Sequence, residues 1–284
     1  MNRISQIFVI TKHHRINIVS IIKSGNSRKI CDLLRQCVLH NDLICLSSVW
    51  ELLIEMYDKQ SSIIHGCKYS ELCQLAAGNG YLECLQYAYE NEFPFSSYET
   101  AGNNLSFMYA SRNGHLDCLR YMHMNGCKWS PDISEVASTH GHLDCLHYAH
   151  TNGCSWGEMT CRAAASFGNI DCLRYLHENG CPWNEMTCYA AAFSGHLDCL
   201  QYMHETGWPW NSGTCLQAAM EGNLDCLRYA HINRCKWKDD TCLFAAWDGH
   251  LDCLRYALQH GCPYYKRECC RFPGVAAVFE ELGL

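Results

Sequence analysis

Most of this chain repeats a short stretch in which apolar residues recur with the period of an α-helix. In the segment IDCLRYLHENG, residues 170–180, Ile170, Leu173 and Leu176 lie three positions apart. This spacing forms one apolar stripe on a helix and leaves the charged residues on the other side. Gly180 follows at a position that suits the left-handed end of a helix. The pattern predicts a short amphipathic helix that buries one face.

Copies of this helix recur at a fixed distance. Those that match best open with Gly114, Gly141, Gly168, Gly195, Gly222 and Gly249, and each glycine follows the previous one after 27 residues. An earlier copy opens at Gly80, and a fainter one, NDLICLSSVWELL, opens at Asn41. A short, fixed period is the sequence signature of a solenoid.

Each copy is preceded by a second short helical segment, as in TCRAAASFG (160–168) and TCLQAAMEG (214–222). The leading threonine is a residue type that caps helix N-termini, so we expect it to cap this helix. The alanine pair Ala164–Ala165 favours helix and lets a neighbouring helix approach closely. Helices of this length are marginal alone, so the sequence predicts helix pairs that are stable only when stacked.

In the order of these features the chain resembles the ankyrin repeat family. AAASFGNIDCLRYLHENGC and AAFSGHLDCLQYMHETG contain the family's alanine pair, its Gly-His, a leucine-rich second helix and an Asn-Gly turn, and the likeness runs from about Glu71 to Tyr264. The Cys- and Trp-rich units are similar to the ankyrin arrays of giant DNA viruses that infect amoebae. The resemblance implies an all-α, ankyrin-like solenoid of helix pairs.

Two departures from the family change the expected fold. The Thr-Pro-Leu-His tetrad reads MTCR or MTCY here, and the period is 27 residues instead of about 33. The missing residues fall where the family places its β-hairpin, so we expect these hairpins to be shortened to tight loops. A longer hairpin is expected only in FPFSSYETAGNNL, residues 93–105.

The repeats predict three regions. Residues 1–70 form a degenerate N-terminal repeat or cap, residues 71–265 the repeat array, and residues 266–284 a C-terminal cap. Pro273 stands where a first helix would continue, so the last region departs from the repeat.

Charge and composition narrow the classes of partner. The chain has 22 Lys and Arg against 29 Asp and Glu, a formal net charge of −7, which argues against nucleic acid as a partner. No stretch approaches the roughly 20 apolar residues of a membrane span. The first residues, MNRISQIFVITKHHR, lack a signal-peptide pattern. We therefore expect an intracellular, cytoplasmic monomer (in the host cytoplasm if the protein is viral), with no membrane partner.

The repeated histidines and cysteines suggest a metal site, but helix geometry argues against one. His115, Cys118, His123 and Cys127 have a zinc-like spacing. However, Cys118 and His123 would point about 140° apart around one helix. Other repeats also replace the first histidine by asparagine and one cysteine by Trp208. We expect no metal and no cofactor.

We interpret the 23 cysteines as reduced residues that pack in the core. Most fall in three registers: in the second helix (Cys84, Cys118, Cys145, Cys172, Cys199, Cys226, Cys253), in the first helix (Cys73, Cys161, Cys188, Cys215, Cys242, Cys269) and after the turn (Cys127, Cys154, Cys181, Cys235, Cys262). Equivalent cysteines of stacked repeats should lie too far apart for disulfides. Cysteines of different registers could still form disulfides with one another.

No enzyme motif stands out. The sequence lacks a glycine-rich phosphate loop, G-x-S-x-G and H-E-x-x-H. A catalytic nucleophile is one distinguished residue, whereas Cys–His pairs recur here throughout the array. Trp129, Trp156, Trp183, Trp210 and Trp237 recur every 27 residues and are expected to cap the loop edge of the core. We predict a chain that is not an enzyme.

The positions that vary between repeats are the candidates for binding. After each alanine pair the next residue reads Ser166, Phe193, Met220 and Trp247, and the one after reads Phe167, Ser194, Glu221 and Asp248. The resemblance to ankyrin repeats implies that these positions line a concave binding face. The alternative is that the large apolar residues pack on adjacent loops.

The predicted function is therefore a non-catalytic scaffold that binds another protein. One alternative is a substrate adaptor that recruits a ubiquitin ligase through an F-box-like segment within residues 1–70, where NDLICLSSVWELL faintly resembles that motif. The other is a metal or redox protein that uses the Cys/His grid.

Overall fold

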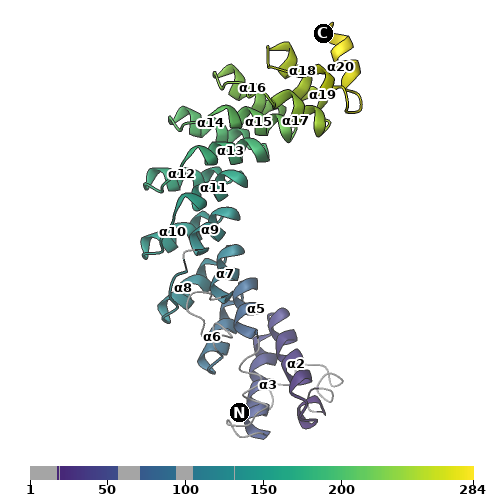
Figure 1. Ribbon diagram of the computed structural model, residues 1–284. Coiled ribbons are helices and arrows are strands. Elements are labelled where there is room, and N and C mark those ends of the chain that lie inside the picture. Colours follow the sequence, from purple (N-terminus) through teal and green to yellow (C-terminus); the bar gives the residue numbers. More distant parts are fainter. Residues whose placement is uncertain (1–17, 19, 57–70, 94–104, 131) are drawn as a thin grey trace. The chain divides into compact units, whose positions relative to one another are not determined.

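The computed structural model describes residues 18, 20–56, 71–93, 105–130 and 132–284 (Figure 1). All regular elements in these ranges are α-helices. The first helices of the repeats are α5 (Leu72–Asn79), α7 (Leu105–Arg112), α9 (Asp132–Thr139), α11 (Glu158–Ser166), α13 (Glu185–Ser194), α15 (Ser212–Met220) and α17 (Thr241–Trp247). The second helices are α6 (Leu82–Glu90), α8 (Leu116–Met124), α10 (Leu143–Thr151), α12 (Ile170–Glu178), α14 (Leu197–Glu205), α16 (Leu224–Ile232) and α18 (Leu251–Gln259).

The chain divides into two compact units. One contains the described residues up to Ile133 together with Tyr148–Cys154, and the other contains Ser134–His147 and Ser155–Leu284. In the second unit α11, α13, α15 and α17 pack in succession as one layer, and α12, α14, α16 and α18 form a layer beside them. In the first unit α5 packs on α7, and α6 on α8, in the same way.

The predicted period and the shortened loops are both confirmed. From α8 onward the second helices begin at residues 116, 143, 170, 197, 224 and 251, which are 27 apart. Only residues 179–184 separate α12 from α13, and no strand forms within the described ranges. The expected longer hairpin falls mainly on residues 94–104, which lie outside those ranges.

The repeat glycine ends each first helix in a left-handed conformation. Gly168 and Gly195 have φ of 71° and 78°, a region that glycine adopts without strain. At the faint N-terminal copy the same position is Asn41, with φ of 51°. Asparagine tolerates this region better than most residues. Residues on either side of Asn41 accordingly form another helix pair, α2 (Ser27–Leu39) and α3 (Leu43–Met56).

The prediction that threonine caps the first helices was wrong. Thr160 is the third residue of α11, and its buried Oγ1 accepts a hydrogen bond from the Gly157 N–H at 3.3 Å. The caps come earlier: Asn184 accepts from the Met186 N–H at 3.0 Å, and Asn211 accepts from the Gly213 N–H at 2.8 Å. The first helices therefore start several residues before the expected site, except α17, in which threonine is the first residue.

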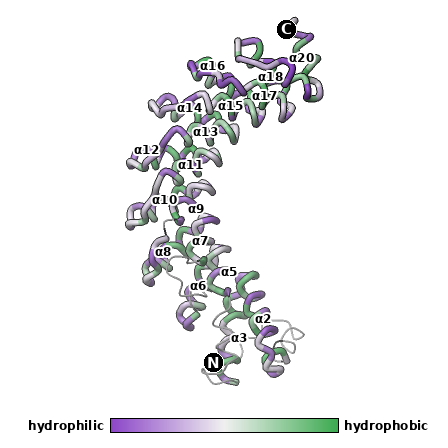
Figure 2. The backbone as a smooth tube through the Cα atoms, viewed as in Figure 1, coloured by the Kyte–Doolittle hydropathy of each residue, from purple (hydrophilic) through white to green (hydrophobic). Residues whose placement is uncertain are grey.

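The alanine pairs and the second-helix leucines make up the core. Ala164, Ala165 and Leu173 have no exposed surface, and their equivalents in the following repeats are equally buried. In the second unit hydrophobic residues run along the first helices, whereas the outer turns of the second helices are hydrophilic (Figure 2). Small alanine side chains let the first helices approach one another, as expected.

The array continues at both ends in modified form. α2 packs on α5 and α3 on α6, and the indole N–H of Trp50 donates to Asn91 Oδ1 at 3.0 Å. At the other end α20 (Val275–Leu282) packs on α18, after the single turn α19 (Lys266–Cys269). None of the helices in the described part of the chain is long and apolar enough to span a membrane.

Candidate functional site

The eight variable residues of the first helices all lie in the second unit, and six of them are exposed. We call them the first-helix face: Ser166, Phe167, Phe193, Ser194, Met220, Glu221, Trp247 and Asp248. The exposed fractions of Phe167, Phe193 and Trp247 are 59%, 42% and 63%. Ser194, Glu221 and Asp248 are also exposed, whereas Ser166 and Met220 are half-buried.

The packing of the first helices places these residues along one side. Ala191 and Ala192 are completely buried, and Phe193 follows them about 100° further around the helix. In α11, α15 and α17 a buried alanine pair is likewise followed by a variable residue, and these helices pack in succession with α13. Equivalent positions therefore follow one another from helix to helix, and the large side chains point away from the core.

Two members of the face also make contacts within the chain. The Trp247 ring stacks loosely on Phe244 and Phe272, with centroid distances of 6.4 and 5.9 Å. The Met220 sulfur lies 3.9 Å from Gln217 Nε2. Gln217 and Phe244 belong to the same helices as Met220 and Trp247, so the alternative in which these side chains pack on neighbouring segments applies in part only to Trp247, through Phe272. Even so, most of the Trp247 side chain remains exposed, which is unfavourable for an indole of this size.

Side chains from the next repeat hold the ends of first helices such as α9 and α13. Asn223 Nδ2 donates to the carbonyl oxygens of Ala192 and Phe193 at 3.0 and 2.7 Å. Asn169 does the same to Ser138 and Thr139 at 2.7 and 2.9 Å. These bonds satisfy carbonyls that a helix C-terminus leaves without partners. They also fix the backbone from which Phe193 projects.

This role explains why histidine and asparagine interchange after the repeat glycine, a point that the sequence analysis missed. His115, which was the first member of the zinc-like set, has its Nε2 3.1 Å from the Gly78 carbonyl oxygen. An imidazole N–H and an amide N–H can serve the same acceptor. The repeated replacement of one by the other was the available signal that a hydrogen-bond donor is needed at this position.

The second histidine of the zinc-like set also has a different partner. His204 Nδ1 is hydrogen-bonded to the Tyr229 hydroxyl of the next repeat at 2.9 Å, and its ring stacks on Trp210 with centroids 4.2 Å apart. The same hydrogen bond joins His123 and Tyr148, His177 and Tyr202, and His231 and Tyr256. Among the described residues no group of three or more His, Cys, Asp or Glu side chains is placed to hold a metal ion.

The tryptophans, which were expected to cap the loop edge of the core, also connect neighbouring repeats. The indole N–H of Trp129 donates to the Asn152 carbonyl oxygen at 2.8 Å, and that of Trp237 to the His260 carbonyl oxygen at 3.2 Å. Trp208, which replaces a turn cysteine, stacks on Trp183 with centroids 4.4 Å apart. Trp183 therefore belongs to the packing between repeats and provides a comparison for the exposed Trp247.

The second-helix cysteines are buried, and burial keeps thiols such as that of Cys199 protonated at neutral pH. Cys199, for example, has no exposed surface, and burial raises the pKa of its thiol to about 12. Burial has the same effect on Cys118 and Cys172. A thiol needs to ionise to act as a nucleophile. These cysteines therefore serve as packing residues.

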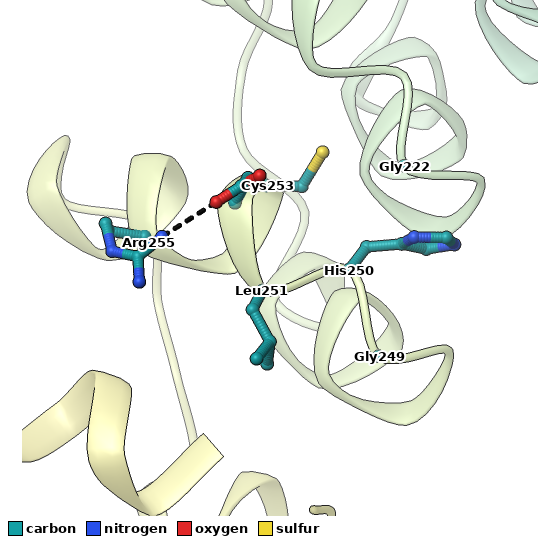
Figure 3. Close-up of a pocket in the computed structure, with 7 residues that line it drawn as sticks. Gly222, Gly249, His250, Leu251, Cys253 and Arg255 are labelled. Atoms are coloured by element: carbon teal, nitrogen blue, oxygen red, sulfur yellow. Dashed lines mark hydrogen bonds and ion pairs between the residues drawn. The ribbon is translucent and has the colours of Figure 1, made fainter. Parts of the chain in front are cut away.

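One shallow pocket, of about 410 Å³, lies at the last full repeat (Figure 3). His250 extends beneath Gly222, as the residue after the repeat glycine does in earlier repeats. At Gly249 a Cβ atom would meet nothing within 4 Å, since no histidine or asparagine of a further repeat fills the space. Arg255 at its rim is bound to Asp252 and Glu281 at 2.8 and 3.1 Å. The pocket thus follows from the end of the repeat pattern.

Comparisons with known proteins agree with this architecture. A family model described as "Ankyrin repeats (many copies)" matches residues 161–204. Among solved structures, the ankyrin repeat domain of human ASB11 is similar, with a TM-score of 0.50 and 17% identity over 58% of this chain and 84% of that domain. The fold is that of an ankyrin repeat domain. No curated protein sequence matches the chain.

Proposed function

We propose that this protein is a non-catalytic scaffold that binds another protein through its first-helix face. One observation carries the proposal: at four successive repeats, invariant buried alanines are followed by residues that vary and are mostly exposed. A residue needed only for packing would be expected to stay constant with the alanines. The concave side of a solenoid is its usual binding surface.

The chemistry of the face indicates what the partner should present. Phe167, Phe193 and Trp247 offer large apolar surface, and aromatic residues dominate the binding energy of many interfaces. Glu221 and Asp248 lie beside them and are exposed. We therefore expect a protein that presents apolar side chains flanked by Lys or Arg, since charges of opposite sign favour encounter.

The test is to capture proteins from a cell extract with matched variants. Phe193→Ser removes an exposed aromatic from the face, and Ile232→Ser removes an exposed apolar residue, 72% exposed, from the end of the second helix α16. A protein that binds the wild type and the Ile232 variant, but not the Phe193 variant, supports the proposal. Equal capture by all three, or loss only with the Ile232 variant, contradicts it.

The proposal includes a reducing, intracellular setting and a monomeric chain. The described cysteines are numerous and mostly buried, a composition more typical of proteins inside cells than of secreted ones. A protein of the Cys- and Trp-rich viral type would act in the host cytoplasm. Measuring the molar mass of the purified chain in solution, with and without reductant, tests the monomeric state.

A further inference from the structure

Two cysteines near the N-terminal end of the array face each other directly. Cys37 in α2 and Cys45 in α3 have their sulfur atoms 3.1 Å apart, in hydrogen-bond contact. The turn between the two helices is held by the Asp42 N–H, which donates to the Cys37 carbonyl oxygen at 2.8 Å. The two sulfur atoms would therefore need to approach each other by only about 1 Å to reach the roughly 2.05 Å of a disulfide bond.

This pair is specific to one helix pair of the array. Cys45 stands at the second-helix cysteine position, four residues after the glycine or asparagine that ends the first helix. Cys37 stands four residues before Asn41, where every other repeat has alanine: Ala76, Ala110, Ala137, Ala164, Ala191, Ala218 and Ala245. Only in this helix pair, therefore, does the second-helix cysteine meet a sulfur at the alanine position. The other repeats supply an internal control.

Cys45 is also more accessible than its equivalents. It is half-buried, whereas Cys84, Cys118 and Cys226 at the same register are at most 1% exposed. The Cys37 thiol donates to Cys45, which lowers the pKa of Cys45, and together with burial it raises the pKa of Cys37. Cys45 lies in the first turn of α3, where the helix dipole favours a thiolate, although the nearby Asp42 carboxylate opposes this.

Thiol pairs between the other registers lack this access. Cys215 and Cys235 interact through their thiols, but they are 0% and 4% exposed. Cys242 and Cys262 form a similar pair with 0% and 2% exposed surface. An oxidant in solution would reach these sulfurs only after local unfolding.

We propose that Cys37 and Cys45 form a redox site that is converted to an intramolecular disulfide by exchange with a small disulfide such as glutathione disulfide. The Cys45 thiolate attacks one sulfur of the glutathione disulfide, the S–S bond breaks, and one glutathione thiolate leaves. Cys37 then loses its proton and attacks the Cys45 sulfur, and the second glutathione leaves as a thiolate. Two protein thiols are oxidised, one glutathione disulfide is reduced to two glutathiones, and the thiol protons pass to the leaving thiolates.

The consequence is a covalent link between α2 and α3. It would close residues 37–45 into a small ring around the Asn41 turn. The helix pair would then be unable to open at its connecting end, so α2 would stay attached to α3 when other contacts within this pair open. The link affects the end of the array and leaves the first-helix face unchanged.

The experiment treats the folded, fully reduced chain with glutathione disulfide, blocks the remaining thiols and maps the peptides by mass spectrometry. We expect a linked pair of Cys37 and Cys45 peptides, formed about tenfold faster than any modification of Cys226. The variant Cys37→Ala installs the residue that all other repeats have, so it should fold. It should stop at a mixed disulfide of glutathione with Cys45.

Three results would overturn the proposal. In the first, Cys45 is modified no faster than Cys226 in the wild type. In the second, the wild-type chain accumulates the mixed disulfide without linking to Cys37. In the third, Cys45 links to a different cysteine. Circular dichroism of the Cys37→Ala variant, with Cys37→Ser as a second variant, checks that the fold is intact before its reactivity is compared.

Discussion

The repeat glycines differ in what lies beside them, and this allows a matched test of how one repeat holds the next. Gly195 has φ of 78°, and a Cβ added to it would lie 2.6 Å from Asn223 Oδ1. Gly249 has φ of 77° and the same place in its repeat, but a Cβ there would meet nothing within 4 Å. Gly195→Ala and Gly249→Ala therefore share the backbone strain and differ only in the clash.

The expected costs follow from these two contributions. An alanine in the left-handed region costs about 1–2 kcal/mol, which both variants incur. In Gly195→Ala the amide of Asn223 must also move away and lose its bonds to the carbonyl oxygens of Ala192 and Phe193, at about 1 kcal/mol each. We expect Gly195→Ala to lower the free energy of unfolding by about 3–4 kcal/mol in total, roughly 2 kcal/mol more than Gly249→Ala.

Urea unfolding followed by circular dichroism measures both variants, provided that the slope stays the same. Adding Asn223→Ala completes the comparison, because the clash and the two hydrogen bonds disappear together. The double variant should then be about as stable as Gly195→Ala alone, a non-additivity of roughly 2 kcal/mol. Equal losses for Gly195→Ala and Gly249→Ala, or strictly additive effects with Asn223→Ala, would refute this account of the contact between repeats.

Three further predictions concern the array as a whole. Titration with a thiol reagent should detect few cysteines in the folded chain and all 23 in denaturant; a native count close to the denatured one would contradict their burial. Deleting the 27 residues from Gly168 to Ser194 should leave a folded, shorter and less stable array, because contacts link nearest neighbours; a deletion variant without helical circular dichroism would count against this. Desolvation and the neighbouring His260 lower the pKa of His231, which also faces Tyr256 and Trp237, so protonation opposes folding. Stability should be complete above the ordinary value of 6.5 and fall as the pH drops below it, and His231→Gln should weaken that dependence; an unchanged profile in the variant would rule out this histidine as a cause.

The period, the helix pairs and the buried positions could be predicted because each has a local signal. Gly168 and its equivalents mark the ends of the first helices from α5 onward, and the alanine pairs and leucines fall at helical spacing. The helix starts could not be placed so well. Threonine is a residue type that caps helices well, so it was chosen in place of Asn184 and Asn211, which perform the capping of α13 and α15. These two asparagines directly follow Trp183 and Trp210, and they were the available signal for the start of those helices.

Contacts between repeats were harder to foresee, because they join residues about 30 positions apart. Nothing within one repeat shows that Asn223 reaches the carbonyl oxygen of Phe193. The first-helix face could be proposed from variation within the chain together with the resemblance to ankyrin repeats. Its exposure depends on how neighbouring helices and the C-terminal segment pack, as the partial stacking of Trp247 on Phe272 illustrates.

The central claim is that the chain binds a protein through the first-helix face, and one paired measurement tests it most directly. The affinity of a captured partner and the melting temperature are measured for Trp247→Ala and for Trp183→Ala. Trp247 is 63% exposed, whereas Trp183 stacks on the buried Trp208. We predict that Trp247→Ala weakens binding by about tenfold or more and hardly changes the melting temperature, since an aromatic anchor contributes roughly 2 kcal/mol. Trp183→Ala should lower the melting temperature and leave the affinity of the folded protein unchanged. If Trp247→Ala destabilises the array as much as Trp183→Ala does, or leaves binding unaltered, the proposed face is wrong.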